Sequence, residues 1–430
     1  MYQLNRKSMN HYQVIVVGGG QAGLSASYCL KKENINHLVL DRGEIGDSWG
    51  KRRWDSFCLV TPNWQCRLPG FDYDGNDPKG FMVKDEIVDY VKRYAESFNP
   101  PIKGNVEVHK VYKKGTNSVF NVDTSIGNFT ADKVIIATGA YHIPNILPMS
   151  KGFDDSITQI HSADYKNPEQ FSEGATLVVG SGQSGAQIAE DLHIAGKKVY
   201  LSVGTAPRAP RTYRGKDAVE WLEDMGYYDQ PIEMHPDPEE ARHKTNHYLT
   251  GRDGGRDIDL RKLASEGVQL RGQIGPVENG SISFNNDLKE NLDAADATYE
   301  RIQNNIDKYI EINNIEAPEP TRYEAMWEPN IDNEAPIDYK AEGIKSVIWC
   351  TGFKVDFKWV DFPKVYDQRG YPTYKRGVTE ESGLYFIGLP WLHTWGSGRF
   401  SHVAQDAEYI SNHIVSAFND EIVETCLTKK

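Results

Sequence analysis

One glycine pattern occurs twice in this chain, each time between an apolar run and a stretch with helical spacing. The first copy, Gly18–Gly23, follows the apolar run Val14–Val17, and the second, Gly180–Gly185, follows Leu177–Val179. Both fit the motif G-x-G-x-x-G in the strand-then-helix context that gives it meaning. The loop residues are Gly18, Gly20, Gln21, Ala22 and Gly23 in the first copy, and Gly180, Gly182, Gln183, Ser184 and Gly185 in the second.

The motif places its glycines where a nucleotide phosphate comes close to the main chain. The first glycine permits a tight turn, the second lets the backbone approach a pyrophosphate, and the third lets helix and strand pack closely. The helix N-terminus then offers unpaired N–H groups and the positive end of its dipole. Two such loops predict two Rossmann-like dinucleotide-binding domains in an α/β protein.

A second pair of landmarks repeats in the same order. The run Val134–Ile136 leads to Ala137 and then to Thr138 and Gly139, and the run Val347–Trp349 leads to Cys350 and then to Thr351 and Gly352. Each pair follows one glycine loop. Two ordinary glycine turns in a single α/β domain would leave this repeated order unexplained, so the repeat favours two related units.

The residue that ends the second strand of such a unit indicates its ligand. In the first unit the expected strand His37–Leu40 ends at Asp41, with Arg42 beside it. A carboxylate at this position accepts a hydrogen bond from a ribose hydroxyl and repels a 2′-phosphate. We therefore expect FAD in the first unit.

The second unit has no acid at the corresponding position. Its expected strand Val199–Leu201 ends at Ser202, and Arg208 and Arg211 follow. A hydroxyl and two guanidinium groups suit a 2′-phosphate, which predicts NADPH. The alternative is a solvated basic loop, since the prolines beside both arginines leave its path open.

These motifs predict an FAD-binding domain split by an inserted NADPH-binding domain. The FAD domain takes residues 1–149 and 351–430, and the NADPH domain takes residues 150–350. Inside the insertion, apolar residues recur at steps of four and three and predict a long helix over about Asp287–Asn313. Its seam, including Leu292, Tyr299 and Ile306, predicts packing on another helix of the domain or on a partner subunit, so a homodimer is one expectation.

Composition narrows the function classes. With 48 Lys and Arg against 61 Asp and Glu, the net charge of −13 argues against nucleic-acid or anionic-membrane binding. The five cysteines are scattered and form no C-x-x-C pair, which argues against a disulfide framework and favours a cytoplasmic setting. His243 and His247 have i, i+4 spacing but no evident third ligand, so we expect no metal site.

The order of these motifs resembles the class B flavoprotein monooxygenases and their relatives. The stretch Gly46–Asp55 reads GDSWGKRRWD and Leu59–Asn63 reads LVTPN. The segments Arg53–Cys58 (RWDSFC) and Trp395–Phe400 (WGSGRF) look most like bacterial flavin-dependent oxidoreductases that accompany nitrilase gene clusters. The resemblance spans nearly the whole chain.

The resemblance implies roles for single residues. Ser48, Trp49 and Thr61 would lie along the flavin, and Thr138 and Gly139 would close over it. Asn63 would place an amide beside the flavin C4a position as a catalytic group, and the alternative is a turn residue after Pro62. The start of the last helix would meet the pyrimidine end of the flavin, where its dipole stabilises negative charge.

One departure from the family affects the reaction. The identifying motif F-x-G-x-x-x-H-x-x-x-Y/F keeps its last part at His161 and Tyr165, but Asp155 and Ile157 replace its Phe and Gly. We expect an NADPH-dependent flavoprotein monooxygenase that uses molecular oxygen on a small, possibly nitrogen-containing substrate. A reductase or oxidase that releases peroxide, and a non-catalytic FAD redox-sensing module, are the alternatives.

Overall fold

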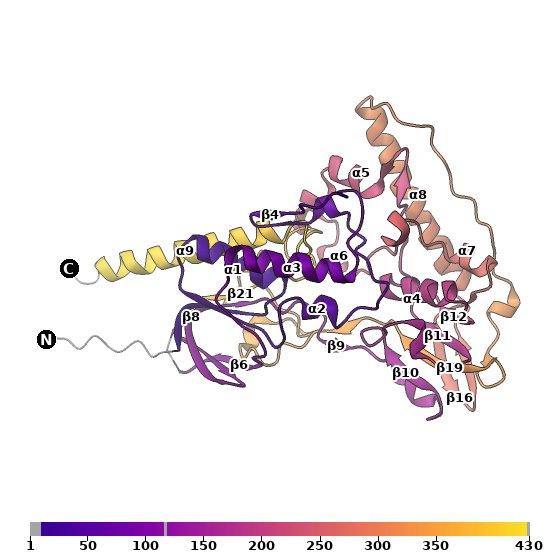
Figure 1. The fold of residues 1–430 in the computed structure, drawn as a ribbon, viewed down its shortest axis with the longest axis horizontal. Coiled ribbons are helices and arrows are strands. Elements are labelled where there is room, and N and C mark those ends of the chain that lie inside the picture. Colours follow the sequence, from indigo (N-terminus) through magenta and orange to yellow (C-terminus); the bar gives the residue numbers. More distant parts are fainter. Residues whose placement is uncertain (1–9, 116–117, 428–430) are drawn as a thin grey trace.

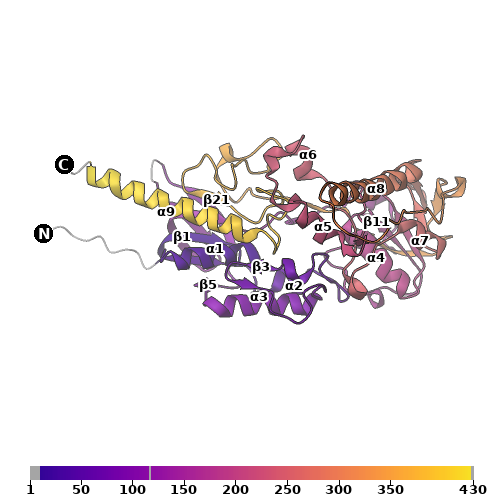
Figure 2. The same cartoon turned by 90° about the horizontal axis from the view of Figure 1, so that it is seen from above.

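A computed structural model describes residues 10–115 and 118–427 of the chain. It contains two open α/β sheets at opposite ends of an elongated molecule (Figures 1 and 2). This confirms the predicted pair of Rossmann-like units. In the described ranges, no helix combines the length and the apolar character that crossing a membrane requires.

The first sheet has the strand order β5-β2-β1-β8-β7-β6, and β21 also pairs with β8. Its strands are β1 (His11–Val17), β2 (His37–Leu40), β5 (Ile102–Lys103), β6 (Val108–Lys113), β7 (Phe120–Thr124), β8 (Gly127–Ile136) and β21 (Leu384–Phe386). Strands β5, β2, β1, β8 and β21 run parallel, whereas β6, β7 and β8 form an antiparallel meander. The meander lies on the side of β8 that faces away from β1's other neighbour, β2.

Three helices cover this sheet: α1 (Gln21–Lys32), α3 (Lys84–Phe98) and α9 (Val403–Leu427). Helix α9 runs alongside α1 in both views (Figures 1 and 2) and shares one apolar core with it. Helix α3 buries Ile87, Tyr90, Val91 and Tyr94, which recur at helical spacing along one face. It ends at Asn99, whose left-handed backbone (φ 48°) stops the helix.

The second sheet is wholly parallel and has the order β10-β19-β11-β12-β15. Its strands are β10 (Thr158–His161), β11 (Ala175–Val179), β12 (Val199–Ser202), β15 (Gln269–Arg271) and β19 (Ile344–Trp349). Helix α4 (Gln183–Ile194) follows β11 directly. Between β12 and β15 lie α5 (Ala218–Asp224), α6 (Pro238–His243), α7 (Leu260–Ser265) and the small pair β13 (Thr212–Tyr213) and β14 (Lys216–Asp217).

Two short strands connect the units. The chain leaves the first sheet through β9 (Ile143–Pro144) and returns through β20 (Phe353–Lys354), and the two strands pair antiparallel. The Thr351 hydroxyl donates to the Asn145 carbonyl beside them. The predicted domain limits at 149/150 and 350/351 lie close to these crossings and stay a prediction.

The long helix α8 (Leu288–Ile312) matches the predicted helix closely. Its seam is buried against the chain itself: Leu292 joins the core of the second sheet, and Ile306 packs with Tyr213 and Trp221. A partner subunit is therefore not needed to cover this seam. Strands β16 (Ile274–Glu278), β17 (Ser281–Phe284) and β18 (Ile337–Asp338) form a small sheet nearby.

Candidate active site

The first glycine loop has the geometry that a pyrophosphate requires. Gly18 has φ 110°, and a Cβ there would lie 2.5 Å from the Ala137 carbonyl oxygen. A Cβ on Gly23 would lie 1.8 Å from the Gly18 carbonyl oxygen, so the turn of α1 packs directly on the loop. A Cβ on Gly20, in contrast, would meet no protein atom within 4 Å. Gly18 and Gly23 are therefore needed because a side chain would collide with the backbone. Gly20 instead leaves an open space at the N-terminus of α1, where a pyrophosphate can bind.

Asp41 closes the edge of this loop. Its carboxylate accepts hydrogen bonds from the backbone N–H of Gly19 at 2.5 Å and of Gly43 at 2.8 Å. These bonds fix the carboxylate at the end of β2, where a ribose would lie. Arg42 beside it is exposed.

Several residues expected along the flavin come together. The Gln21 carboxamide donates to the Gly398 carbonyl at 2.9 Å and accepts from the Trp49 indole N–H at 3.3 Å. The Trp49 ring also stacks on Phe400, with centroids 5.3 Å apart. The first glycine loop, helix α2 (Asp47–Gly50) and the segment before α9 are thus joined. Ser48, in α2, is exposed.

Other predicted residues lie around the end of β8. Thr138 is exposed, and its hydroxyl lies 3.3 Å from His142 Nε2. Gly139 has φ 71°, and a Cβ there would meet nothing within 4 Å. Ala22 is buried, and Thr61 is half-buried.

The Asn63 side chain makes hydrogen bonds at both ends of its amide. Its Nδ2 donates to the Asp77 carbonyl at 2.9 Å, and its Oδ1 accepts from the Met82 backbone N–H at 2.7 Å. The side chain is 3% exposed. Both ends of the amide therefore fix the loop between Asp77 and Met82, as expected of a turn residue, and a catalytic role for Asn63 stays a prediction.

The second glycine loop repeats the packing of the first. Gly180 has φ 97°, and a Cβ there would lie 2.7 Å from the Cys350 carbonyl oxygen. A Cβ on Gly185 would lie 1.7 Å from the Gly180 carbonyl oxygen. The Thr-Gly pair at Thr351 and Gly352 follows Cys350, as Thr138 and Gly139 follow Ala137.

The second loop differs in what lies over it. The Thr245 methyl is 3.4 Å from the position of a Cβ on Gly182, where the first loop is open at Gly20. Gln183 and Gln187 both donate to the Leu249 carbonyl, at 2.5 and 2.8 Å. We call residues 244–251 the strap, because they lie across the start of α4. A dinucleotide on this loop needs the strap to shift.

Ser202 and the two arginines do not face this loop. The Ser202 hydroxyl donates to the Gly272 carbonyl at 3.0 Å. Arg208 pairs with Asp296 at 2.9 Å and with Asp259 at 3.5 Å. In this structure both side chains contact other protein groups, and their predicted role in binding a 2′-phosphate stays a prediction.

Arg211 is occupied in the same way. It pairs with Asp217 at 3.1 Å and donates to the Val60 carbonyl at 2.8 Å. Its guanidinium lies over the Phe81 ring, 4.6 Å from the centroid. Arg211 thus joins the insertion to the first domain rather than presenting a free cation to a phosphate.

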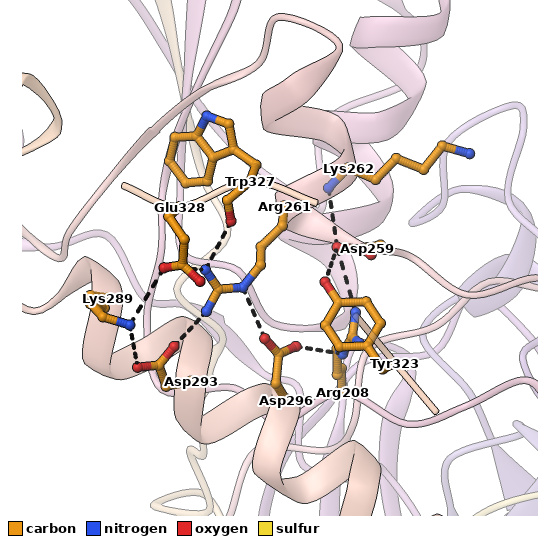
Figure 3. Close-up of polar contacts among 10 residues, drawn as sticks. All are labelled: Arg208, Asp259, Arg261, Lys262, Lys289, Asp293, Asp296, Tyr323, Trp327 and Glu328. Carbon is orange, nitrogen blue, oxygen red and sulfur yellow. Dashed lines mark hydrogen bonds and ion pairs between the residues drawn. The ribbon is translucent and has the colours of Figure 1, made fainter. Parts of the chain in front are cut away.

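Arg208 belongs to a buried ion network (Figure 3). Asp296 bridges Arg208 and Arg261, and Arg261 also pairs with Asp293 at 2.5 Å and Glu328 at 3.0 Å. Burial raises the pKa of Asp296, while the two guanidiniums lower it. The network joins α7, α8 and the exposed segment around Glu328, so its role is to hold the insertion together.

The two residues that remain of the identifying motif, His161 and Tyr165, make contacts within the second unit. His161 Nε2 lies 2.9 Å from the Gly352 carbonyl oxygen, and the Tyr165 hydroxyl donates to Asp191 of α4 at 2.7 Å. Ile157, at the motif's Gly position, is buried in the core of the second sheet. Burial lowers the pKa of His161, which favours the neutral ring. The retained residues orient the Thr-Gly turn and α4.

Sequence reasoning missed a group of buried polar atoms before and within α9. Among the described residues, several buried side-chain atoms there have no hydrogen-bond partner: His393 Nδ1, Thr394 Oγ1, Ser401 Oγ, His402 Nδ1 and Asp406 Oδ2. Gln65 Oε1, in the 3-10 turn Asn63–Gln65, is a further such atom. Leaving such an atom unpaired costs about 1–3 kcal/mol, so a polar ligand is the natural partner. The polar edge of a flavin, expected at this helix start, fits these donors and acceptors.

The two histidines with i, i+4 spacing do not lie on one helix. Helix α6 ends at His243, so His247 lies outside it, in the strap. Across residues 10–115 and 118–427, no group of three or more His, Cys, Asp or Glu side chains could hold a metal ion.

The chain has two α/β units, the second inserted into the first, and each contains one glycine loop. This arrangement is typical of two-domain, dinucleotide-binding oxidoreductases. Residues 15–223 match the family model described as pyridine nucleotide-disulphide oxidoreductase. A CzcO-like oxidoreductase of Geobacillus kaustophilus is 34% identical over 406 residues, 94% of this chain and 98% of the relative. The chain belongs to this family of CzcO-like, flavin-monooxygenase-like oxidoreductases.

Other comparisons agree with this assignment. A probable indole-3-pyruvate monooxygenase of Arabidopsis thaliana is 32% identical over 182 residues, 41% of this chain and 43% of that protein. The flavin-containing monooxygenase of Stenotrophomonas maltophilia covers 95% of this chain and 99% of its own, with a TM-score of 0.64 at 18% identity. Bacillithiol disulfide reductase of Staphylococcus aureus has a TM-score of 0.61 at 12% identity, with the same shares covered. These structures support the fold, and the likeness to nitrilase-cluster oxidoreductases stays a prediction.

Proposed function

We propose that the chain is an FAD-dependent oxidoreductase that NADPH reduces and that uses molecular oxygen to oxygenate a small organic substrate. The observation that carries the proposal is the open position above Gly20, between the packed glycines Gly18 and Gly23. A second loop of the same packing, at Gly180 and Gly185, supports a second dinucleotide. A cytoplasmic location and a nitrogen-containing substrate remain expectations.

FAD would lie on the first loop, with its pyrophosphate at Gly20 and its ribose at Asp41. When bound, the flavin supplies the redox chemistry, taking up two electrons with a hydride and passing them to an acceptor. The residues of this chain position it: the α1 N-terminus offers N–H groups, and Gln21 ties that helix to the segment before α9. The stacked rings of Trp49 and Phe400 would shield one side of the bound flavin from water.

The second candidate is an NADPH-dependent flavin reductase or oxidase that releases peroxide. Buried Ile157 at the motif's Gly position favours it, because the linker then packs as core rather than as a glycine turn. The third candidate, an FAD redox-sensing module, is favoured by the strap over Gly182, which lies where a nicotinamide cofactor would bind.

One experiment separates the three. Flavin-loaded protein is mixed with NADPH without oxygen, and flavin bleaching at 450 nm is followed. Oxygen is then admitted with a panel of small substrates, and peroxide and oxygenated product are both measured. Product formation supports the oxygenase, whereas peroxide equal to the NADPH consumed supports the oxidase. A flavin that NADPH does not bleach would leave only the sensing module.

A further inference from the structure

Arg399 is a partly buried cation that has no carboxylate partner among the described residues. Its guanidinium lies over the Trp395 ring, 3.8 Å from the centroid. One nitrogen donates to the Trp395 carbonyl, and another donates to Asn246 Oδ1 at 3.0 Å. All of these neighbours are neutral.

Two arginines of the inserted domain, unlike Arg399, have carboxylate partners. Arg208 lies between Asp259 and Asp296, and Arg211 pairs with Asp217. Desolvating a cation costs several kcal/mol unless an anion compensates it. A neutral environment for Arg399 thus costs free energy that the paired arginines avoid, and an anionic ligand would offset that cost.

The groups that influence the pKa of Arg399 are, like its hydrogen-bond partners, not carboxylates. Burial lowers the pKa of the guanidinium, and the groups that oppose this shift are the hydroxyls of Tyr141, Tyr228 and Tyr227. In the nearby strap, burial lowers the pKa of His247 to about 4, and the positive charges of Arg301 and Lys244 add to the effect. No carboxylate is among the groups that oppose the lowered pKa of Arg399.

Arg399 also lies where both cofactor loops converge. Its neighbour Gly398 is bonded to Gln21, the first residue of α1. Its own partner Asn246 follows Thr245, which covers Gly182 of the second loop. The ring under the guanidinium, Trp395, also contacts the Tyr228 ring, with centroids 4.8 Å apart.

We propose that Arg399 binds the anionic group of a small ligand, either the carboxylate of an aromatic substrate or the diphosphate of the nicotinamide cofactor. The guanidinium would exchange Asn246 for two parallel hydrogen bonds to the anion, the geometry in which Arg binds carboxylates and phosphates most strongly. The rings of Trp395 and Tyr228 suit an aromatic body on a substrate. The proposal rests on the proposed function, since the ligand belongs to the flavin reaction.

The test uses flavin-loaded protein and ligand-induced changes in flavin absorbance. The probes are 3-phenylpropanoate, its neutral amide 3-phenylpropanamide, and NADP⁺. They are titrated into the natural protein, Arg399→Gln, Arg399→Lys and the control Arg322→Gln, whose residue is 49% exposed and pairs with Asp307. The flavin content of each variant is measured first, and Arg399→Lys keeps the charge if Arg399→Gln binds flavin poorly.

Two results support the proposal and identify the source of the anion. If the carboxylate is the ligand, the natural protein should prefer the acid to the amide at least tenfold, and Arg399→Gln should lose that preference. If the diphosphate is the ligand, Arg399→Gln should weaken NADP⁺ binding at least tenfold while the acid and amide bind alike. Unchanged affinities for all probes in Arg399→Gln would overturn the proposal. Failure of NADPH to bleach the flavin would instead count against the proposed function, because these titrations need no turnover.

Discussion

Arg399 donates a hydrogen bond of 3.0 Å to Asn246, and this bond joins the segment before α9 to the strap over the second glycine loop. The strap is fixed at its other end by Gln183 and Gln187, which donate to the Leu249 carbonyl. A dinucleotide on the second loop must displace Thr245 from Gly182. The free energy of these contacts therefore opposes cofactor binding.

Asn246→Ala should favour the open strap. Removing a hydrogen bond to a charged donor shifts the closed–open equilibrium by about 1.5–3 kcal/mol, so NADP⁺ affinity should rise by roughly tenfold or more. Equilibrium titration of flavin absorbance measures it. Asn313→Ala, at the C-terminal end of α8, is the matched control and should not change the affinity. Weaker NADP⁺ binding in Asn246→Ala would show that the strap forms part of the cofactor site instead.

Gly20→Ala should remove FAD without unfolding the protein. The added Cβ meets no protein atom within 4 Å, so the chain tolerates it, but it projects into the space expected for the pyrophosphate. Purified protein should be nearly colourless, with an unchanged far-UV circular dichroism spectrum. Gly182→Ala makes the same change in the second loop and should keep its flavin while losing NADP⁺ affinity. Full flavin content in Gly20→Ala would refute the assignment of the first loop.

Arg208→Ala should lower stability and leave cofactor preference alone. The change leaves Asp259 without its cation and Asp296 with Arg261 alone, and breaking a buried pair typically costs about 3–5 kcal/mol. Urea unfolding measures the loss. Arg322→Ala removes an exposed partner of Asp307 and should cost no more than about 1 kcal/mol. A changed ratio of KM for NADPH and NADH in Arg208→Ala would support the 2′-phosphate role.

Asp406 should make stability depend on pH. Burial in the first turn of α9 raises its pKa to about 6, against the opposing effects of Ser397 and Arg376. The folded state then binds a proton that the unfolded state releases above about pH 4, so stability falls as pH rises from about 4 to 6. A shift of about two units corresponds to roughly 3 kcal/mol.

The Asn side chain in Asp406→Asn carries no charge, so this variant should not lose stability as the pH rises from about 4 to 6. It should be more stable than the natural protein at pH 7, on the order of 2–3 kcal/mol, with the difference shrinking below pH 6 and vanishing near pH 4. Urea unfolding at several pH values measures it. Asp420→Asn, at an exposed site on the same helix, should show no such trend. A difference that stays constant with pH would contradict the raised pKa.

Local patterns predicted the elements that frame the site. The glycine loops, the Thr-Gly strand ends and α8 are each recognised from residues close together in the chain, so the sequence alone is enough to predict them. The roles of Arg208 and Asn63 depended on partners that only folding brings near. Asp296 lies far along the chain from Arg208, and no spacing rule connects the two.

The residues missed entirely share one cause. Gln65 and Asp406 are unremarkable polar residues in sequence, and their chemistry arises from burial in a core assembled by distant segments. The stretch Trp391–Phe400, rich in glycines and aromatic residues, indicated that this part of the chain is near the site. It gave no indication that Gln65 or Asp406 belongs there. Burial of a polar atom is a property of the tertiary fold, so pattern reasoning has no access to it.

Strand β21 and helix α9 complete the first sheet from the far end of the chain. During synthesis, the second sheet has all its strands once residue 349 has left the ribosome, whereas α1 still lacks α9, its packing partner. The inserted domain can therefore fold first, while the domain that surrounds it cannot complete its core until α9 has been made. Flavin capture should accordingly be a post-translational event, and a message truncated before residue 403 should yield an inserted domain that is folded and an outer domain that never holds its cofactor.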